Sequence, residues 1–256
     1  MDLNNKVAVI TGGASGLGRA TAEMVINQGG KVALFDLNED LVAQTAAELG
    51  PNATGFTVNV TEEESVEAAV TATMATFGAI HVNVNCAGIG AASRTLSKEG
   101  AMPLKMFNFV IQVNLIGTFN TLRLCAAQMQ NNEPDNSDNE RGVVINTASV
   151  AAFDGQIGQA AYAASKAGVA GMTLPIARDL GRSGIRVCTI APGIFETPMM
   201  AGAPDRVRDP LIEMVQHPKR LGEAPEYALL ARQIIENPYL NGETIRLDGG
   251  IRMAPR

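Results

Sequence analysis

Short apolar runs rich in β-branched residues recur along the chain and alternate with longer stretches typical of helices. Within these runs the hydrophobic residues are nearly continuous, with little of the polar alternation of a half-solvated strand, which indicates strands covered on both faces. Strands that alternate with helices predict a parallel, doubly wound sheet with helices on both sides. The predicted strands are residues 6–10, 31–36, 54–58, 80–84, 142–147, 185–190 and 243–247.

One α/β domain of the Rossmann type, residues 1–256, accounts for this pattern, and two segments interrupt it. Residues 131–140, "NNEPDNSDNE", are polar and acidic and predict a solvated surface loop. Residues 191–222 combine helix breakers with flexible apolar side chains, which suits a mobile lid over an apolar ligand, with an irregular connection as the alternative. These breakers and apolar residues are Pro192, Pro198, Pro204, Pro210, Pro218, Met199, Met200 and Met214.

Composition and charge narrow the classes of function. The chain has 256 residues, of which 46% are hydrophobic, so it can bury a full core. Its net charge of -6 argues against nucleic acid or an anionic membrane surface as a partner and favours a small-molecule substrate. The first residues lack the features of a targeting leader, and no apolar run approaches the roughly 18 residues of a membrane span, so a cytoplasmic protein is expected.

The cysteines and histidines predict reduced thiols and no bound metal. Cys86, Cys125 and Cys188 are odd in number and far apart, which is typical of free thiols in a reducing compartment. His81 and His217 are isolated and lack the spacing of a zinc site.

A glycine-rich turn follows the first predicted strand. In "VAVITGGASGLG" the chain passes through Gly12, Gly16 and Gly18 into a helix. Glycines let the backbone approach a pyrophosphate closely, and the first amides of the helix point at the anion. Asp36 ends the second predicted strand, 18 residues after Gly18. A carboxylate at that place accepts hydrogen bonds from an adenosine ribose, which predicts a dinucleotide site.

Asp36 also predicts which dinucleotide binds. Its carboxylate would repel the 2'-phosphate of NADP, and the glycine turn contains no Arg or Lys that would attract that phosphate. NAD is therefore the predicted cofactor. Taken alone, Asp36 could be a turn or helix-capping residue, but that alternative leaves the glycine turn unexplained.

Four polar residues lie where the apolar pattern does not call for them. Ser149 follows the strand at 142–147, and Asn114 interrupts the apolar stretch "FVIQVNLIGTF", where it is either a structural bracket or part of a polar network. Tyr162 and Lys166, four residues apart, share one helix face. A neighbouring ammonium lowers the pKa of a phenol, whose ordinary value is about 10, and makes it a usable acid or base for an alcohol proton.

Several motifs resemble those of the short-chain dehydrogenases/reductases over essentially the whole chain. "TGGASGLG" is similar to that family's cofactor loop, "NCAG" (85–88) to its NNAG element, "YAASK" to its YxxxK site and "APGIFETPM" to its PG segment. The resemblance implies a catalytic tetrad and a metal-free hydride transfer. The tetrad would be Asn114, which holds a water, Ser149, which holds the substrate oxygen, Tyr162, the acid/base, and Lys166, which binds the nicotinamide ribose.

The same resemblance implies the cofactor contacts, with two departures. Asn59 and Val60 stand where the family has Asp-Val against the adenine, so an amide oxygen would accept that bond with less charge. Cys86 replaces the second Asn of the NNAG element, and its backbone would lie near the adenosine. The implied contacts are Gly12, Ser15, Gly16, Leu17, Gly18, Asp36, Asn59, Val60, Cys86, Gly88, Tyr162, Lys166, Pro192, Gly193, Phe195 and Thr197.

Longer strings within 142–180, 186–200 and 220–253 resemble the type II 3-hydroxyacyl-CoA dehydrogenases, a group also described as 17β-hydroxysteroid dehydrogenases. This resemblance implies an NAD-dependent homotetramer that converts (S)-3-hydroxyacyl-CoA to 3-ketoacyl-CoA. The substrate contacts would be Ser149, Gln156 and Tyr162, and Arg94, Lys98 and Lys105 could meet CoA phosphates.

Other functions remain open from the sequence. One is a hydroxysteroid or broader secondary-alcohol dehydrogenase, and another is a catalytically idle, NAD-binding redox sensor. A ketoacyl-carrier-protein reductase is disfavoured, because Asp36 argues against NADPH.

Overall fold

The computed structural model describes residues 1–201 and 205–255. Its main sheet has seven strands in the order β11-β8-β7-β4-β1-β2-β3, and every neighbouring pair is parallel. The strand order confirms the doubly wound fold, and all the predicted strands belong to this sheet. The strands are β1 (Val7–Thr11), β2 (Lys31–Asp36), β3 (Ala53–Thr57), β4 (Val82–Asn85), β7 (Gly142–Thr147), β8 (Ile185–Pro192) and β11 (Thr244–Leu247).

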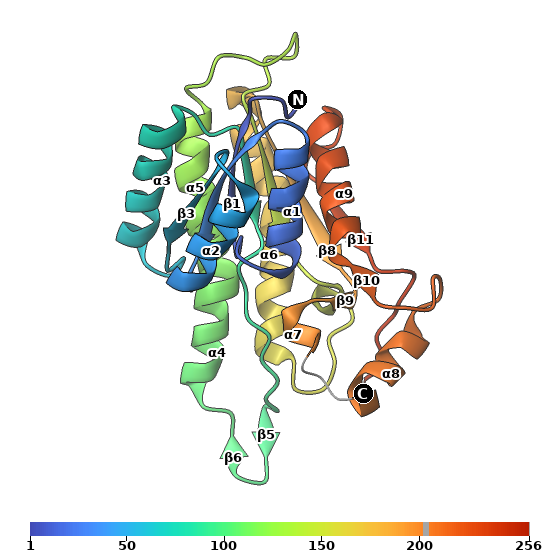
Figure 1. The fold of residues 1–256 in the computed structure, drawn as a ribbon. Helices are drawn as coiled ribbons and strands as arrows, with labels where there is room; N and C mark the ends of the chain where they lie inside the picture. The colour runs from blue at the N-terminus through green and yellow to red at the C-terminus, as the bar shows by residue number, and fades with distance from the viewer. Residues whose placement is uncertain (202–204, 256) are drawn as a thin grey trace.

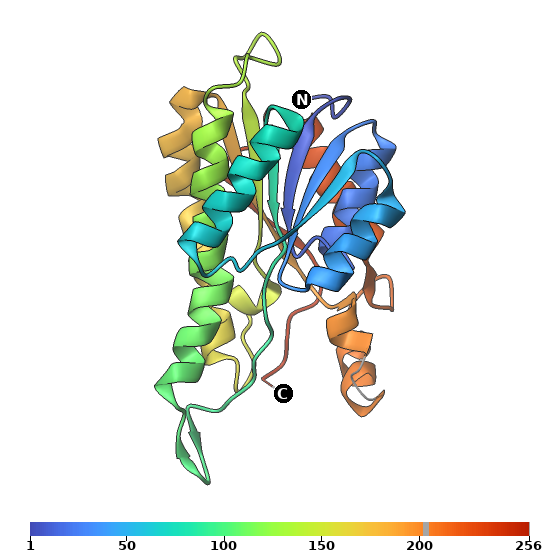
Figure 2. The ribbon, with the colours of Figure 1, turned by 60° about the vertical axis from the view of Figure 1, so that its left-hand side comes forward.

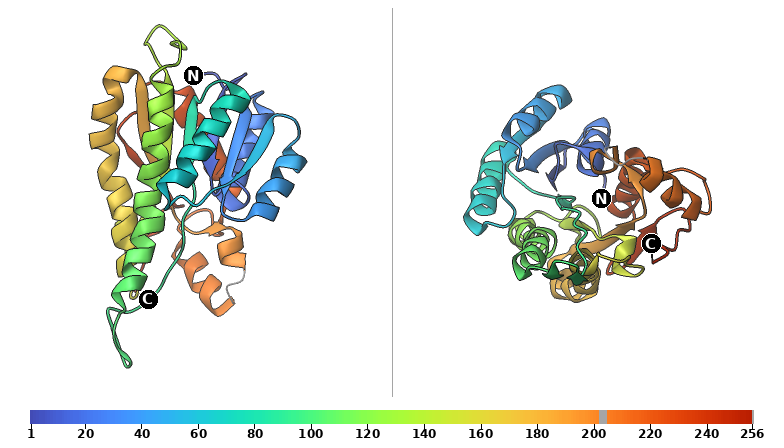
Figure 3. Two further views of the ribbon diagram at one scale, coloured as in Figure 1. Left: turned by 90° about the vertical axis from the view of Figure 1, so that its left-hand side faces the viewer. Right: turned by 90° about the horizontal axis from the view of Figure 1, so that it is seen from below.

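Helices cover both faces of the sheet (Figure 1, Figure 3). One face packs its apolar residues against α1 (Gly16–Asn27), α2 (Glu39–Leu49) and α9 (Ala224–Glu236). The other face packs against α3 (Glu63–Phe77), α5 (Gly117–Met129) and α6 (Ala160–Leu180). Strands β1, β4, β7 and β8 are buried along their whole length, which explains their continuous hydrophobicity.

Helix α4 (Leu104–Ile111) continues into α5 through a π-helical turn at Gln112–Ile116. The whole stretch Leu104–Met129 has the length and mean hydropathy of a membrane-spanning helix, so the expectation that no such run exists was wrong. Half of its most apolar window is buried inside the fold, where α4 packs on α6 and α5 on α3. A core helix of a soluble protein passes the same test of length and hydropathy, so one such helix is weak evidence for a membrane span.

The short elements cluster beyond the carboxyl ends of the main strands. A short hairpin of two-residue strands, β5 (Leu96–Ser97) and β6 (Gly100–Ala101), projects past the amino-terminal end of α4 (Figure 2). The segment predicted as a lid contains β9 (Phe195–Glu196), α7 (Pro198–Ala201) and α8 (Asp205–Met214), and β9 pairs with β10 (Gly222–Glu223). Its residues 202–204, including Pro204, lie outside the described residues.

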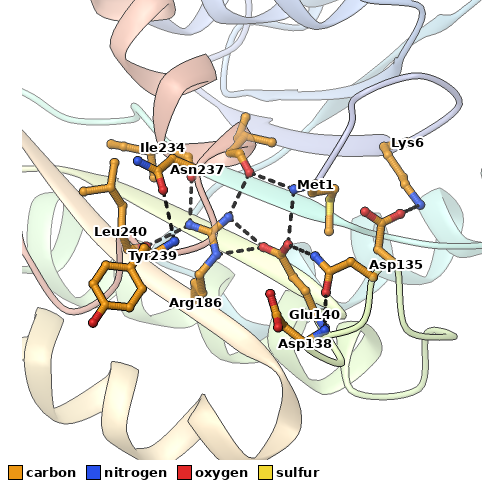
Figure 4. Close-up of polar contacts among 12 residues, drawn as sticks. Met1, Lys6, Asp135, Asp138, Glu140, Arg186, Ile234, Asn237, Tyr239 and Leu240 are labelled. Carbon is orange, nitrogen blue, oxygen red and sulfur yellow. Dashed lines mark hydrogen bonds and ion pairs between the residues drawn. The ribbon is translucent and has the colours of Figure 1, made fainter.

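At the amino ends of the strands, charged groups form a buried network (Figure 4). Glu140 accepts bonds from the amino group of Met1 at 3.2 Å and from Arg186 at 2.7 Å, and its side chain is only 4% exposed. Arg186 also donates to the carbonyls of Ile234, Ile235 and Leu240. The prediction of a solvated loop at 131–140 was therefore wrong for Glu140, because its charge is neutralised by partners far away in sequence.

Candidate active site

A cleft of about 910 Å³ opens at the carboxyl ends of the strands. It lies where the sheet order reverses between β1 and β4, the place where doubly wound folds bind ligands. Every predicted cofactor residue lines it, as do Ser149, Tyr162 and Lys166, whereas Asn114 and Gln156 do not.

Two glycines make the turn between β1 and α1 possible. Gly12 has a φ of +62°, which favours glycine, and a Cβ there would lie 3.0 Å from the backbone nitrogen of Ala87. A Cβ on Gly18 would lie 2.2 Å from the carbonyl oxygen of Gly12, so only glycine lets α1 pack this closely. Ser15 precedes α1 without capping it through its side chain, which leaves the first amides of the helix available to an anion.

Asp36 lies at the end of β2 with its carboxylate held in place. One oxygen accepts a bond from the backbone of Ala14 at 3.1 Å and the other from Asn38 at 3.2 Å. The loop therefore fixes the carboxylate toward the cleft, beside the glycine turn. Among the described residues that line the cleft, Lys166 is the only cation, and it comes from α6.

Asn59 also lines the cleft, but its amide is already engaged. Its oxygen accepts bonds from the backbone and hydroxyl of Thr61 at 3.1 and 2.8 Å, and its nitrogen donates to Glu62 at 2.8 Å. A carbonyl oxygen has two lone pairs, so this one has no acceptor site left for an adenine amino group. The expectation that Asn59 replaces the family's aspartate as an acceptor is not met in this arrangement.

Cys86 presents its backbone to the cleft and its thiol to the core. The sulfur lies 3.7 Å from the hydroxyls of Tyr227 and Thr147, and those hydroxyls are 2.7 Å apart. Burial raises the pKa of the thiol, so the cysteine stays protonated. The side chain thus fills space behind the sheet, as expected for a residue that contributes only its backbone to the cleft.

Lys166 is a buried cation, and no carboxylate in the described part of the chain forms an ion pair with it. Its side chain is almost fully buried, and Nζ donates to the carbonyl of Thr147 at 2.8 Å. The ammonium lies 5.9 Å from the centre of the Tyr162 ring, one turn earlier on α6. Desolvation lowers the pKa of Lys166 to about 8.

Tyr162 titrates in the opposite direction from the sequence-based expectation. Burial raises the pKa of its phenol, and the interaction with Ser149 opposes that rise. The Lys166 ammonium lies 5.9 Å from the ring centre and donates its hydrogen bond to Thr147, so burial outweighs any lowering of the phenol's pKa by its charge. In this arrangement the phenol is a protonated hydrogen-bond donor at neutral pH.

Asn114 does not line the cleft, and its buried amide is fully engaged with protein groups. Its oxygen accepts from the backbone of Ile89 at 2.8 Å, and its nitrogen donates to the carbonyl of Ile89 at 3.0 Å and to Ser165 at 3.1 Å. It sits in the π-helical turn, a feature often found at functional sites. These contacts tie the loop after β4 to α6, and they continue through the Ser165 hydroxyl to the carbonyl of Tyr162, so they fit both alternatives for this buried amide.

Gln156 is placed differently from the prediction. Its amide nitrogen donates to the carbonyl of Ala254 at 2.9 Å, so the side chain is engaged with the C-terminal segment. Gln159 lines the cleft instead, as do Met200 and Met253. No local sequence pattern marks Gln159 or Met253, because only the fold brings them to the cleft.

The cations considered for CoA phosphates stand apart from the cleft walls. Arg94, Lys98 and Lys105 are exposed around the β5–β6 hairpin. None of them lines the cleft.

The donor set fits a nicotinamide dinucleotide better than a metal. The described residues contain no group of three or more His, Cys, Asp or Glu that could hold a metal ion. The Gly12–Gly18 turn, which leaves the first amides of α1 free, and the fixed Asp36 carboxylate match the pyrophosphate and ribose of such a cofactor.

Comparison with known proteins agrees with this geometry. A model of the short chain dehydrogenase family matches residues 6–207. The chain is 54% identical over 255 residues to "3-hydroxyacyl-CoA dehydrogenase type-2" of Drosophila melanogaster, covering 99% of this chain and 100% of the relative. The Homo sapiens protein of the same name is 55% identical, with 97% and 96% covered.

A crystal structure of "3-hydroxyacyl-CoA dehydrogenase type-2" from Mycobacterium avium superposes with a TM-score of 0.94 at 40% identity, covering 98% of each chain. The fold, the cleft and these similarities lead to one conclusion: the chain belongs to the short-chain dehydrogenase family, whose members are oxidoreductases that use a nicotinamide cofactor.

Proposed function

We propose that this protein is an NAD-dependent dehydrogenase that interconverts (S)-3-hydroxyacyl-CoA and 3-ketoacyl-CoA. The observation that carries the proposal is the presence of Ser149, Tyr162 and Lys166 in the cleft that also contains Asp36 and the glycine turn. A bound nicotinamide supplies the hydride acceptor or donor. The protein supplies orientation, a proton and an environment that excludes water.

In the proposed mechanism Tyr162 exchanges a proton with the substrate oxygen while Ser149 donates a hydrogen bond to that oxygen. Because burial raises the pKa of the phenol, it is protonated at neutral pH and carries the proton that ketone reduction needs. In the oxidising direction the phenol must give up its proton first. The Lys166 ammonium then stabilises the phenolate, and a pKa of about 8 keeps most of the lysine charged at neutral pH.

The substrate class is supported by the names of the relatives and by the apolar part of the cleft. Ile194 and Met253 line it and pack against Val150, next to Ser149, while Met200 lines it as well, and such side chains suit an acyl chain. They would also accept a steroid, so hydroxysteroids are the second candidate.

NAD is proposed over NADP because Asp36 places a fixed carboxylate where the 2'-phosphate would lie. Replacing Asp36 by Ser should relax the preference by at least roughly tenfold, measured as the ratio of the dissociation constants for NADH and NADPH. An unchanged ratio would overturn the assignment of Asp36.

The activity is tested with acetoacetyl-CoA and NADH. We expect turnover by the wild type, and a loss of roughly 10²–10⁴-fold in Tyr162→Phe with NADH binding retained. Normal turnover in that variant would remove Tyr162 from the mechanism. A wild type that binds NADH but reduces neither acyl-CoA nor ketosteroid would favour the redox-sensor alternative.

We also propose self-association as a homotetramer. Ile116 in the π-helical turn, Phe119 on α5 and Leu174 on α6 are apolar side chains that are 43–46% exposed, and a second copy would cover them. Analytical ultracentrifugation of the wild type and of Phe119→Glu tests this. A cytoplasmic location stays a prediction from sequence, to be checked by cell fractionation.

A further inference from the structure

The C-terminal segment, residues 251–255, forms part of the active-site wall. Met253 lines the cleft, and it packs with Met214 and Ile194 against a small core cluster that contains Val150 and Ile251. Val150 directly follows Ser149 in sequence, so Met253 lies on the substrate side of the cleft rather than beside the glycine turn.

Two sets of contacts fasten this segment to the loop between Ser149 and Tyr162. At the tip, Gln156 donates to the carbonyl of Ala254 at 2.9 Å, and the amide of Ile157 donates to the carbonyl of Pro255 at 3.0 Å. The amide of Ala254 lies 3.3 Å from the sulfur of Met214, which connects the segment to α8 as well.

At the base, Arg246 connects the same two parts of the chain. Its guanidinium donates to Asp154 at 2.6 Å, to Asp248 at 2.7 Å and to the carbonyl of Ile251 at 3.0 Å. Planar guanidinium groups hold several acceptors in a fixed geometry, so the loop and the C-terminal segment are held as one unit.

We propose that residues 251–255 are a specificity wall, in which Met253 limits the size of the acyl group and Gln156 is a positioning residue that holds the wall in place. The inference rests on the proposed function for the nature of the substrate. It differs from the sequence-based role of Gln156, since the amide acts on the protein's own backbone rather than on the substrate.

The central experiment compares acyl chain lengths. In Met253→Ala the space vacated by the thioether should raise KM for acetoacetyl-CoA by roughly five- to tenfold and leave KM for a 3-ketoacyl-CoA of eight carbons unchanged or lower. Met74→Ala is the matched control, because Met74 is also half-buried against the core but lies on α3, away from the cleft. Equal changes at both chain lengths in Met253→Ala would overturn the proposal.

Gln156→Glu tests the positioning role, because a carboxylate cannot donate to the Ala254 carbonyl. We expect faster amide exchange at Ile157 in the substrate-free protein and the same shift in chain-length preference as in Met253→Ala, without addition in the double variant. Unchanged exchange together with lost acyl-CoA binding would make Gln156 a direct substrate contact instead.

The exchange measurement needs no substrate, so it separates the two proposals. If exchange responds to Gln156→Glu but the wild type reduces no 3-ketoacyl-CoA, the fastening of the segment stands and the proposed substrate is wrong. If the wild type is active and exchange does not respond, the positioning role is wrong.

Discussion

The two ends of the central sheet both bury charge, but in opposite ways. At the amino ends, Glu140 and Arg186 are 4% and 8% exposed, and they form an ion pair that also holds the amino group of Met1. At the carboxyl ends, Lys166 is 4% exposed and has a carbonyl as its hydrogen-bond partner. No carboxylate among the described residues pairs with it.

This difference separates charge that holds the fold from charge that is available for chemistry. Removing one member of a fully hydrogen-bonded buried ion pair strongly lowers the free energy of unfolding, because the other charge stays buried without a partner. An unpaired buried cation is destabilised, and this shows as a pKa near 8 rather than the ordinary 10.5 of lysine. Perturbed groups of this kind cluster in functional clefts, which is where Lys166 lies.

The largest expected effect is on turnover in Lys166→Met. Removal of the ammonium should lower kcat/KM for acetoacetyl-CoA by roughly 10²–10⁴-fold, because Tyr162 loses the charge that favours its phenolate. The free energy of unfolding of the cofactor-free protein should stay the same or rise, as measured in urea. Lys31→Met, a half-buried lysine at the start of β2, is the control and should retain activity.

A fall in both activity and stability in Lys166→Met would contradict the proposed difference between the buried charges at the amino ends and the carboxyl ends of the strands. The lysine would then be part of the structural scaffold, like Arg186.

Arg186→Met should have the reverse pattern. The substitution leaves Glu140 buried without its main partner, and we expect the unfolding free energy to fall by about 3–5 kcal/mol. The folded fraction should keep its KM values, because the network lies at the other end of the sheet. Denaturant unfolding and steady-state kinetics measure the two properties separately.

Arg232→Met gives a matched comparison. Arg232 also pairs with a glutamate, Glu236 at 2.7 Å, but both side chains are about two-fifths exposed. Its loss should therefore cost no more than about 1 kcal/mol. Equal losses in the two variants would mean that burial of the Arg186 pair has no special role.

The sequence predicted features that leave a local pattern and missed contacts between residues far apart in the chain. The central strands β1, β4, β7 and β8 were predictable because burial on both faces leaves a continuous apolar signature in each of them. The glycine turn and Asp36 line the same cleft, and this could be predicted because glycines and a carboxylate at fixed spacing are typical of a dinucleotide site. The buried Glu140 was not, since its partner Met1 is 139 residues away, and the fastening of Gln156 to Ala254 spans 98 residues. Such contacts leave no local pattern.

The pH dependence of the unfolding free energy should show that Lys166, at the carboxyl ends of the strands, is buried without a counter-charge. The pKa of Lys166 is about 8 in the folded protein, whereas a solvated lysine in the unfolded chain has the ordinary value of 10.5. Between these values the unfolded chain binds a proton that the folded protein does not, so the unfolding free energy should rise with pH. The rise is at most about 3 kcal/mol and should be absent in Lys166→Met.

The measurement is the difference in unfolding free energy between wild type and Lys166→Met from about pH 7 to roughly pH 10.5, since other groups titrate equally in both. A difference that does not change with pH would mean that a negative charge pairs with Lys166 in the dissolved protein. Lys166 would then be a paired buried charge, like those of the Glu140 network.

The smallest expected effect is on cofactor affinity in Asn59→Asp. This substitution adds a charge to the cleft at the carboxyl ends of the strands. The amide oxygen of Asn59 is occupied by Thr61, whereas a carboxylate has a second oxygen that can accept a bond from the adenine amino group. We expect NADH to bind roughly three- to tenfold more tightly, as measured by fluorescence titration. Reduced nicotinamide mononucleotide, which lacks adenine, should bind equally to both proteins.

A second variant accounts for the neighbouring charge of Glu62. In the wild type Glu62 accepts a hydrogen bond from the Asn59 amide, but it would repel a carboxylate at that position, so the gain should be larger in a Glu62→Gln background. An equal gain for both nucleotides would place the added charge elsewhere than beside the adenine, and no gain in either background would mean that the new oxygen turns away from the cleft.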